Sequence, residues 1–261
     1  MQDILDLARY PLDRPGSEDW QDLVDTCRAE LAREGLFNLP GFLRPQALTE
    51  AVADLSPVLA REAFTHAREH NIYFKPRIEE LAPDHPALTR FRTSNRTICA
   101  DQMGASAVIR LYEWAPFAAF LAATMDKAEL HTMSDPLARV NVMSYGAGEA
   151  LNWHFDRSEF TTTLLLQAPQ GGGAFEYAKD LRSEDDPNYD GVARLLQGEG
   201  PSTLMALEPG TLNVFRGKNT AHRVTPVEGP RARMIAVFSY YDRPGVSFTA
   251  EERLGFYGRA A

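Results

Sequence analysis

Cysteine is scarce in this sequence, with only Cys27 and Cys99 among 261 residues. The two are far apart and belong to no CxxC or mixed Cys/His spacing, so the chain offers neither a disulfide framework nor a cysteine-based zinc site. Free thiols are typical of a protein in a reducing compartment. We therefore expect a cytoplasmic protein in which both cysteines are unpaired.

Long apolar runs and a basic leader are also missing. No run approaches the about 20 apolar residues that a membrane helix needs. The first residues, Met1-Gln2-Asp3-Ile4, have neither the basic start nor the apolar core of a signal peptide. We expect no membrane partner and no secretion signal.

Positive charge is in short supply, with 27 Lys and Arg against 36 Asp and Glu and a net charge of −9. A nucleic-acid binder usually carries a basic face, and this sequence has no basic stripe. Arg90, Arg92 and Arg96 form a cluster, but their apolar and hydroxyl neighbours suit a small anion better than a phosphate backbone. We expect no nucleic-acid partner.

The rest of the composition is that of a common globular protein. Hydrophobic residues make up 44% of the chain and charged residues 24%, and a chain of this length can bury a proper core. No internal repeat, linker or low-complexity segment divides it. We therefore expect residues 1–261 to form a single domain.

The N-terminal part, residues 1–135, has a mostly helical pattern. Ser17 is a suitable N-cap for a helix whose apolar stripe ends before Gly35, and Pro45 suits the start of the next helix. The pattern predicts helices over residues 18–33, 45–70 and 107–125, strand-like segments from 36 and at 71–74, and an irregular polar segment at 87–103.

His66 and His70 are four residues apart within the second predicted helix, which would put them on one face. Such a pair needs a third ligand to bind a metal, and none is nearby in the sequence. A role in packing or on the surface is the favoured interpretation.

Strand patterns begin at residue 136. Residues 139–145 alternate between apolar and polar side chains, 161–166 are rich in β-prone residues, and 234–241 form an apolar run. Together with the helical first half, this predicts an α+β fold that is mainly β.

Two segments interrupt or follow these strands. Residues 179–200 are charged and turn-rich, so we interpret them as an insert between strands with one short helix at 192–197. Long inserts of this kind are often lids or binding loops. The C-terminal tail, residues 246–261, is polar and contains the aromatic pair Phe256 and Tyr257.

The pair His154 and Asp156 is the centre of the candidate site. Alternate residues of a strand face the same side, so the imidazole and the carboxylate would point into one cavity. His222 can complete a set of three ligands once the fold brings it close. Two histidines and one carboxylate on one face of a metal leave the opposite positions open, as in the facial triad of non-haem Fe(II) oxygenases.

The motifs around this pair occur in a recognisable order. Tyr145-Gly146-Ala147-Gly148 precedes it, the glycine run 171–173 and the turn Pro209-Gly210 follow it, and basic residues enter the last apolar strand after His222. Over residues 138–243 this order resembles the Fe(II)/2-oxoglutarate-dependent oxygenases.

The resemblance implies a double-stranded β-helix, the jelly-roll or cupin-like core, over residues 136–245, with the N-terminal helices packed on it. It also implies Fe(II) held by His154, Asp156 and His222, with 2-oxoglutarate and O2 as cosubstrates. The chemistry then belongs to the metal and the cosubstrate, and the protein positions them and excludes water.

The resemblance further implies a cation for the far carboxylate of 2-oxoglutarate. Arg231 and Arg233 are two apart and would share a face of the last strand. We favour Arg233 for its place directly before the apolar strand, with Arg231 as the competitor. Tyr145 matches a tyrosine that contacts the cosubstrate, or is a core tyrosine. Asn141 and Thr163 are weaker candidates of the same kind.

A closer resemblance concerns the bacterial group that contains the free-amino-acid radical halogenases and their hydroxylase relatives. It rests on four segments: Asp135-Pro136-Leu137, residues 152–156, residues 163–169 and residues 172–177. It implies a free amino acid or similar small polar substrate, hydroxylated at an unactivated carbon.

The resemblance also separates two reaction types. In the radical halogenases the carboxylate position is Gly or Ala, and chloride takes the vacated place. Asp156 stands at that position in this chain, so hydroxylation is expected.

The substrate contacts are the least specified part of the site. Arg90 and Arg92 are candidates for a carboxylate clamp, because a guanidinium fork matches a carboxylate, or they are surface residues. Tyr257 is a third candidate, from a C-terminal segment that shares the resemblance. No clear acidic pair stands ready for a lysine ammonium, so lysine itself is not the expected substrate.

Two other functions fit parts of the pattern. A protein or prolyl hydroxylase of the same fold would need an open groove, whereas the N-terminal helices and the insert predict a covered pocket. A non-catalytic jelly-roll binding protein would need a metal triad or an arginine, but not both. A small-molecule partner is therefore expected, and the choice between a monomer and a homodimer stays open.

Overall fold

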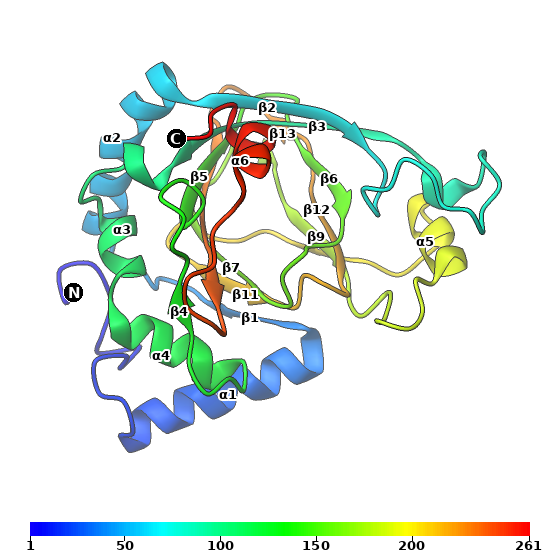
Figure 1. Cartoon of the computed structure of the whole chain (residues 1–261). Helices are drawn as coiled ribbons and strands as arrows, with labels where there is room; N and C mark the ends of the chain where they lie inside the picture. Colours follow the sequence, from blue (N-terminus) through cyan, green and yellow to red (C-terminus); the bar gives the residue numbers. More distant parts are fainter.

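The computed structural model describes all 261 residues, and two antiparallel sheets face each other at its centre (Figure 1). The larger sheet has seven strands, in the order β1 (Leu36–Leu39), β11 (Leu212–Phe215), β7 (Thr161–Gln167), β14 (Arg233–Phe238), β5 (Val140–Tyr145), β3 (Phe91–Cys99) and β2 (Phe64–His70).

The smaller sheet has four strands, in the order β10 (Thr203–Met205), β9 (Phe175–Ala178), β12 (Ala221–Val224) and β6 (Leu151–His154). Two short ribbons complete the β structure: β13 (Val227–Glu228) with β8 (Gly171–Gly172), and β15 (Tyr240–Tyr241) with β4 (His131–Thr132). The expected α+β fold with a jelly-roll core is confirmed.

The central strands of the larger sheet are buried on both faces. Successive side chains of β7 point alternately to the two sides, so Leu164 and Leu166 join the main apolar core on the outer side. Leu165 and Ile235 pack on the inner side, between the sheets. The continuous run Leu164-Leu165-Leu166 therefore serves two environments at once.

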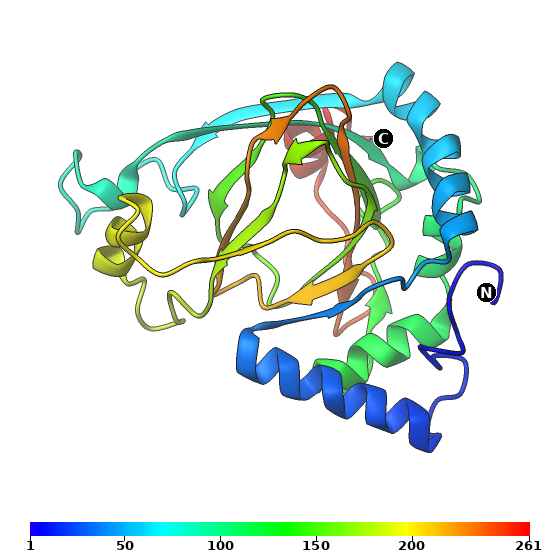
Figure 2. The same cartoon turned by 180° about the vertical axis from the view of Figure 1, so that it is seen from behind.

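Four helices cover the outer face of the larger sheet (Figures 1 and 2). They are α1 (Glu18–Glu34), α2 (Pro45–Glu62), α3 (Ala107–Tyr112) and α4 (Ala115–Thr124). The ends of α1 follow the sequence signals, because the Ser17 side chain accepts the Trp20 N–H and Gly35 ends the helix at φ 77°. None of the helices combines the length and the apolar composition that a bilayer span requires.

The segment after α2 differs from the expectation. The helix ends at Glu62, and residues 64–70 form β2, which pairs with β3. Residues 71–74 are a turn, and most of the segment expected to be irregular is the long strand β3. Backbone pairing between two distant segments overrides local helix propensity in this region, so His66 and His70 lie on a strand.

The long helix expected over residues 107–125 is two helices. Helix α3 ends at Tyr112 and α4 begins at Ala115, with Pro116 in its first turn. Proline lacks the N–H that a continuing helix would need, but it fits a first turn. The break lets both pieces pack on the sheet.

The insert at 179–200 lies away from the space between the sheets. Its helix, α5 (Tyr189–Leu196), starts three residues earlier than expected. Val192 and Leu195 pack with Ile72 and Ala87, and this cluster rests on Trp153. Because Trp153 points opposite to His154 on β6, the insert covers the outside of the smaller sheet and is no lid.

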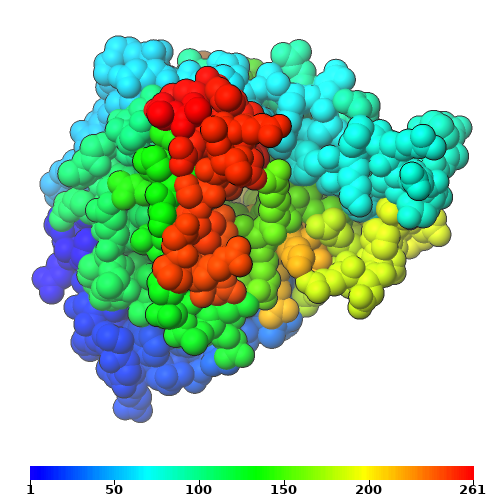
Figure 3. All heavy atoms as spheres, viewed as in Figure 1, coloured from blue at the N-terminus to red at the C-terminus, as the bar shows by residue number.

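The C-terminal segment crosses the molecule close to β2 and β3 and ends in α6 (Ala250–Tyr257) (Figure 3). Asp135 anchors it: this fully buried carboxylate accepts hydrogen bonds from the N–H of Leu137, the N–H of Phe248 and the Arg253 guanidinium, at 2.8–3.0 Å. Burial alone would raise the pKa of Asp135, but these donors lower it to about 2. One residue thus ties α6 to the start of β5.

Asp135→Ala should lower the free energy of unfolding by about 3 kcal/mol, because it leaves Arg253 and buried N–H groups without their acceptor. Urea unfolding measures the change. Asp101→Ala is the matched control. Asp101 also pairs with an arginine, Arg259, but it is partly exposed, unlike Asp135, so its loss should cost less than about 1 kcal/mol. Equal losses in the two variants would contradict the anchoring role of Asp135.

Candidate metal centre

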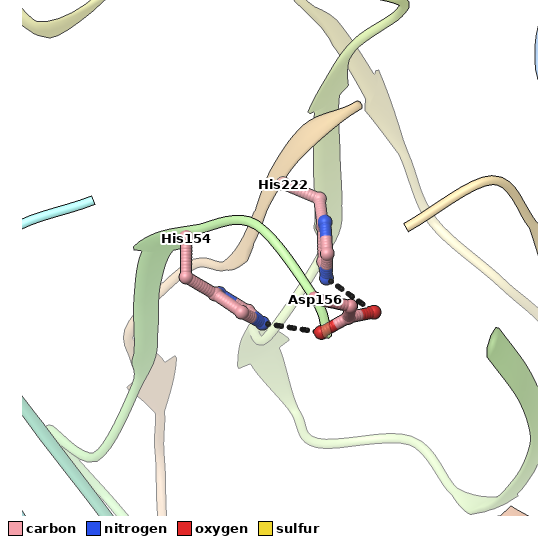
Figure 4. Close-up of side chains that lie close together, drawn as sticks. All are labelled: His154, Asp156 and His222. Carbon is pink, nitrogen blue, oxygen red and sulfur yellow. Dashed lines mark ion pairs between the residues drawn. The ribbon is translucent and has the colours of Figure 1, made fainter. Parts of the chain in front are cut away.

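Three side chains meet between the two sheets (Figure 4). His154 is the last residue of β6 and lies opposite His222 of β12 in the strand register. Asp156 follows two residues later, and its two carboxylate oxygens each lie 3.3 Å from one imidazole Nε2. The potential ligand atoms are all within 4.8 Å of one another.

The route by which Asp156 reaches the site differs from the expectation. Strand β6 ends at His154, so Asp156 does not lie on the strand. Its N–H instead donates to the Gly217 carbonyl at 3.0 Å, and the Thr161 hydroxyl donates to Oδ2 at 2.5 Å. A Cβ at position 217 would lie 2.2 Å from Oδ2. Glycine is therefore needed where this loop passes the carboxylate.

The imidazoles are oriented by backbone carbonyls. His154 Nδ1 lies 2.8 Å from the Asn152 carbonyl, and His222 Nδ1 lies 2.9 Å from that of Thr220. A carbonyl only accepts, so each Nδ1 donates and each Nε2 keeps its lone pair for a metal. Both Nε2 atoms point at Asp156 (Figure 4).

The electrostatics favour an ionised Asp156. Burial by itself would raise its pKa, but the His222 and His154 imidazoles hold it well below its usual value. Burial and the neighbouring His222 lower the pKa of His154. For His222, burial alone would lower the pKa, but the charge of Asp156 and the hydrogen bonds to Asp156 and to the Thr220 carbonyl together raise it. Two imidazole nitrogens and one carboxylate oxygen form a donor set that suits Fe(II).

A cavity of about 310 Å³ opens beside these three residues and contains a second unusual group, Arg233. Arg233 is 2% exposed, and its Nε and Nη1 have no hydrogen-bond partner. Burial lowers its pKa to about 10, so it remains charged at neutral pH. A buried charge without a partner is costly, so this end of the cavity fits the carboxylate of a bound molecule.

Of the other residues expected to bind the cosubstrate, two line the cavity and one lies at the surface. Tyr145 and Thr163 line the same cavity as Arg233, and Arg233 lies 5.8 Å from the Tyr145 ring centre. Arg231 precedes β14 and is exposed, where its guanidinium donates to the Ala168 and Pro169 carbonyls. The expectation that Arg231 and Arg233 share a strand face is wrong, because the strand starts only at Arg233.

A second cavity of about 260 Å³ adjoins the first. Asn141 lines this second cavity rather than the first, and it is held by the Tyr257 hydroxyl at 2.9 Å and the Leu137 carbonyl at 3.0 Å. Its expected contact with the cosubstrate is therefore corrected. Tyr257 lines the second cavity as well, next to Phe256.

The structure does not bring Arg90 and Arg92, the candidates for a carboxylate clamp, to the cavities. Both are exposed, and neither lines a cavity beside the triad. Along β3 the side chains of Thr93, Asn95 and Thr97 are buried, so Arg92 points to the solvent. Arg90 instead contacts Glu69 at the neighbouring strand.

Two further residues of the cavities were not expected from the sequence. Arg68 lines both cavities, and Asn213 lines the first with a buried Oδ1 that has no partner. The alternation of β2, in which His66, Arg68 and His70 face inward, was the available signal for Arg68. It was hidden by the expectation of a helix over those residues.

Comparison with solved structures identifies the class of fold. The non-haem α-ketoglutarate-dependent epimerase SnoN of nogalamycin biosynthesis has a TM-score of 0.58 at 14% identity, over 85% of this chain and 83% of SnoN. A 2OG-Fe(II) oxygenase family protein from Burkholderia pseudomallei has a TM-score of 0.53 at 15% identity, over 89% and 94%. A Pseudomonas putida prolyl-4-hydroxylase has a TM-score of 0.51 at 15% identity, over 82% and 97%.

These likenesses show that the chain has the fold of the Fe(II)/2-oxoglutarate-dependent oxygenases. The family model described as "HalD: Halogenase D" matches residues 19–250, and the chain belongs to that family. Among curated proteins, no sequence matches it.

His154→Ala and His222→Ala should each weaken Fe(II) binding by about a hundredfold or more, because loss of a supporting group around a metal already costs tenfold to a hundredfold. Equilibrium dialysis with Fe(II) under anaerobic conditions measures this, and circular dichroism checks the fold. His131→Ala is the control, since His131 pairs with Glu129 at the surface. Unchanged iron affinity in either variant would remove that histidine from the ligand set.

Proposed function

We propose that this protein is an Fe(II)- and 2-oxoglutarate-dependent dioxygenase that hydroxylates an unactivated C–H bond of a free amino acid or similar small polar metabolite. One observation carries the proposal: the facing His154, Asp156 and His222 share a cavity with the buried, unpartnered Arg233. A metal ligand set and a single cation for a dicarboxylate are the two binding elements that such a reaction needs.

Iron and 2-oxoglutarate, when bound, supply oxidative decarboxylation to succinate and CO2 coupled to oxygen insertion. The protein's own residues would position the metal and the cosubstrate. His154, Asp156 and His222 would hold the metal, and Arg233 would hold the far carboxylate of the cosubstrate. Apolar side chains such as Ile235 and Phe175 line the same cavity and limit the access of water.

Asp156 favours oxygen insertion over halogenation, although the family is described as halogenase D. A halide needs a ligand position that no protein group fills. In this chain the carboxylate occupies it, and the Thr161 hydroxyl and the Gly217 carbonyl fix its direction. Release of Asp156 to admit chloride would break these contacts.

The wall that the C-terminal segment forms favours a small substrate over a peptide. The second cavity lies between β2, β3 and the C-terminal segment, with Phe248, Phe256 and Tyr257 on its wall. Asp135 holds this segment in place, which narrows the space beside the metal ligands for a peptide. The prolyl-4-hydroxylase among the structural neighbours is only 15% identical, so its likeness concerns the fold and carries no argument about the substrate of this protein.

Succinate release tests the function. Fe(II)-loaded protein with 2-oxoglutarate, prepared without oxygen and then oxygenated in buffer with chloride, should form succinate in step with one compound from a panel of free amino acids and small polar metabolites. Mass spectrometry should show a product heavier by one oxygen. A chlorinated product would overturn the assignment of Asp156, and iron binding without any decarboxylation would favour a binding protein.

Arg233→Ala should raise the KM for 2-oxoglutarate by about a hundredfold, because a charge-assisted pair with a carboxylate is lost in a buried place. Arg231→Ala is the matched control and should change the KM by less than about twofold, since Arg231 is exposed. Succinate formation at varied 2-oxoglutarate measures both. The reverse order would move the role to Arg231.

A further inference from the structure

The inner faces of β2 and β3 carry three polar side chains that are not fully satisfied within the chain. Arg68 lies with its guanidinium carbon 4.3 Å from the Phe74 ring centre, and its buried Nε has no hydrogen-bond partner. Asn95 is 4% exposed; its carbonyl accepts the Thr97 hydroxyl at 2.8 Å, while its amide nitrogen has no partner in the chain. The imidazole of His66 makes no hydrogen bond either.

These three side chains all line the second cavity, and Arg68 also reaches the first. Strand pairing puts His66 directly opposite Asn95, with Arg68 two residues further along β2. Their donors therefore converge on one wall, next to the cavity that holds the metal ligands. Leaving the buried Arg68 Nε unpaired costs free energy, so the wall fits an acceptor that a ligand brings.

Positive charges predominate around the second cavity. Arg68 and Arg157 line it, and the only carboxylate on its wall is Asp156, whose oxygens face His154 and His222. Arg157 is itself exposed and paired with Glu252 at 3.0 Å. No acidic side chain remains to neutralise an ammonium on a substrate side chain.

Apart from Arg68, Asp156 and Arg157, the side chains that line both cavities are uncharged, and all but Thr161 are apolar. Met143, Leu151 and Val237 line both cavities, and Phe248 and Phe256 close the second one. Uncharged carbon chains gain free energy by contact with such a surface, whereas a charged group there would lose its hydration.

We propose that Arg68, with Asn95 and His66 beside it, binds the carboxylate of a small substrate whose side chain is uncharged, and that this wall selects against cationic side chains such as that of lysine. The guanidinium offers a two-donor fork to the carboxylate, the Asn95 amide a further donor, and the apolar wall takes the carbon chain that points at the metal. This inference rests on the proposed function and specifies its substrate class.

The test uses the anaerobic complex of the protein with Fe(II) and 2-oxoglutarate, for which the proposed function predicts a charge-transfer absorption band. The first set of probes is the neutral aliphatic and aromatic amino acids, each compared with its carboxamide. The second is the pair norleucine and lysine, whose side chains differ in length by one atom at most and end in a methyl group and an ammonium group, respectively. At least one neutral acid should perturb the band, its amide should bind about tenfold or more weakly, and norleucine should bind better than lysine.

The variants locate the effect. Arg68→Gln should weaken binding of the acid about ten- to a hundredfold, Arg68→Lys should retain part of it, and both should keep the band of the 2-oxoglutarate complex. Arg92→Gln is the matched control, since Arg92 lies on the solvent side of the neighbouring strand, and it should change nothing.

Four outcomes would overturn the proposal: equal binding of acid and amide, tighter binding of lysine than of norleucine, an unaffected Arg68→Gln variant, or no neutral acid that perturbs the band. Absence of the band before any substrate is added is a different result, because it would remove the proposed oxygenase function and this inference together. A phosphate ester that binds where carboxylates do not would likewise overturn the assignment of a carboxylate.

Discussion

The contact of Asp156 with the two imidazoles is the constraint on which the rest of the site depends. His154 and His222 face each other because β6 and β12 are paired, and the turn after β6 must bring Asp156 back to both Nε2 atoms. That turn works only because Gly217 leaves room for the carboxylate and its carbonyl accepts the Asp156 N–H. The three ligands are thus in place before a metal binds, which reduces the reorganisation that binding requires.

A buried guanidinium, Arg233, and a half-buried one, Arg68, extend this arrangement. Arg233 has unpartnered donors in the first cavity, and Arg68 has one at the wall shared with the second. Arg233 lowers the stability of the protein without a ligand, since it is removed from water without an anion. Under the proposals above, Arg233 takes the carboxylate of the cosubstrate and Arg68 that of the substrate, so each anion has its own cation.

Membership of the halogenase D family does not decide the reaction. Under the proposed function, the outcome depends on whether a protein carboxylate fills one ligand position, and Asp156 does so with support from Thr161. The fold supplies the two sheets and the cavities, and it places Arg233 and Arg68 on the cavity walls. Under the same proposal, a single side chain selects between oxygen and halide, which is consistent with the general separation of fold from function.

The sequence by itself determined the features that depend on neighbours along the chain. The short spacing of His154 and Asp156, Arg233 at the head of an apolar strand, the caps of α1 and the mainly β second half could all be predicted, because each has a local signal. Only the tertiary structure decided the rest. Pairing with β3 turned residues 64–70 from an expected helix into β2, which brought Arg68 inward, and the alternation of β3 put Arg92 outside. Pairing and register join segments that are distant in the chain, and a shift of one residue exchanges the two faces of a strand, so composition and spacing alone could not tell which arginine enters the cavity.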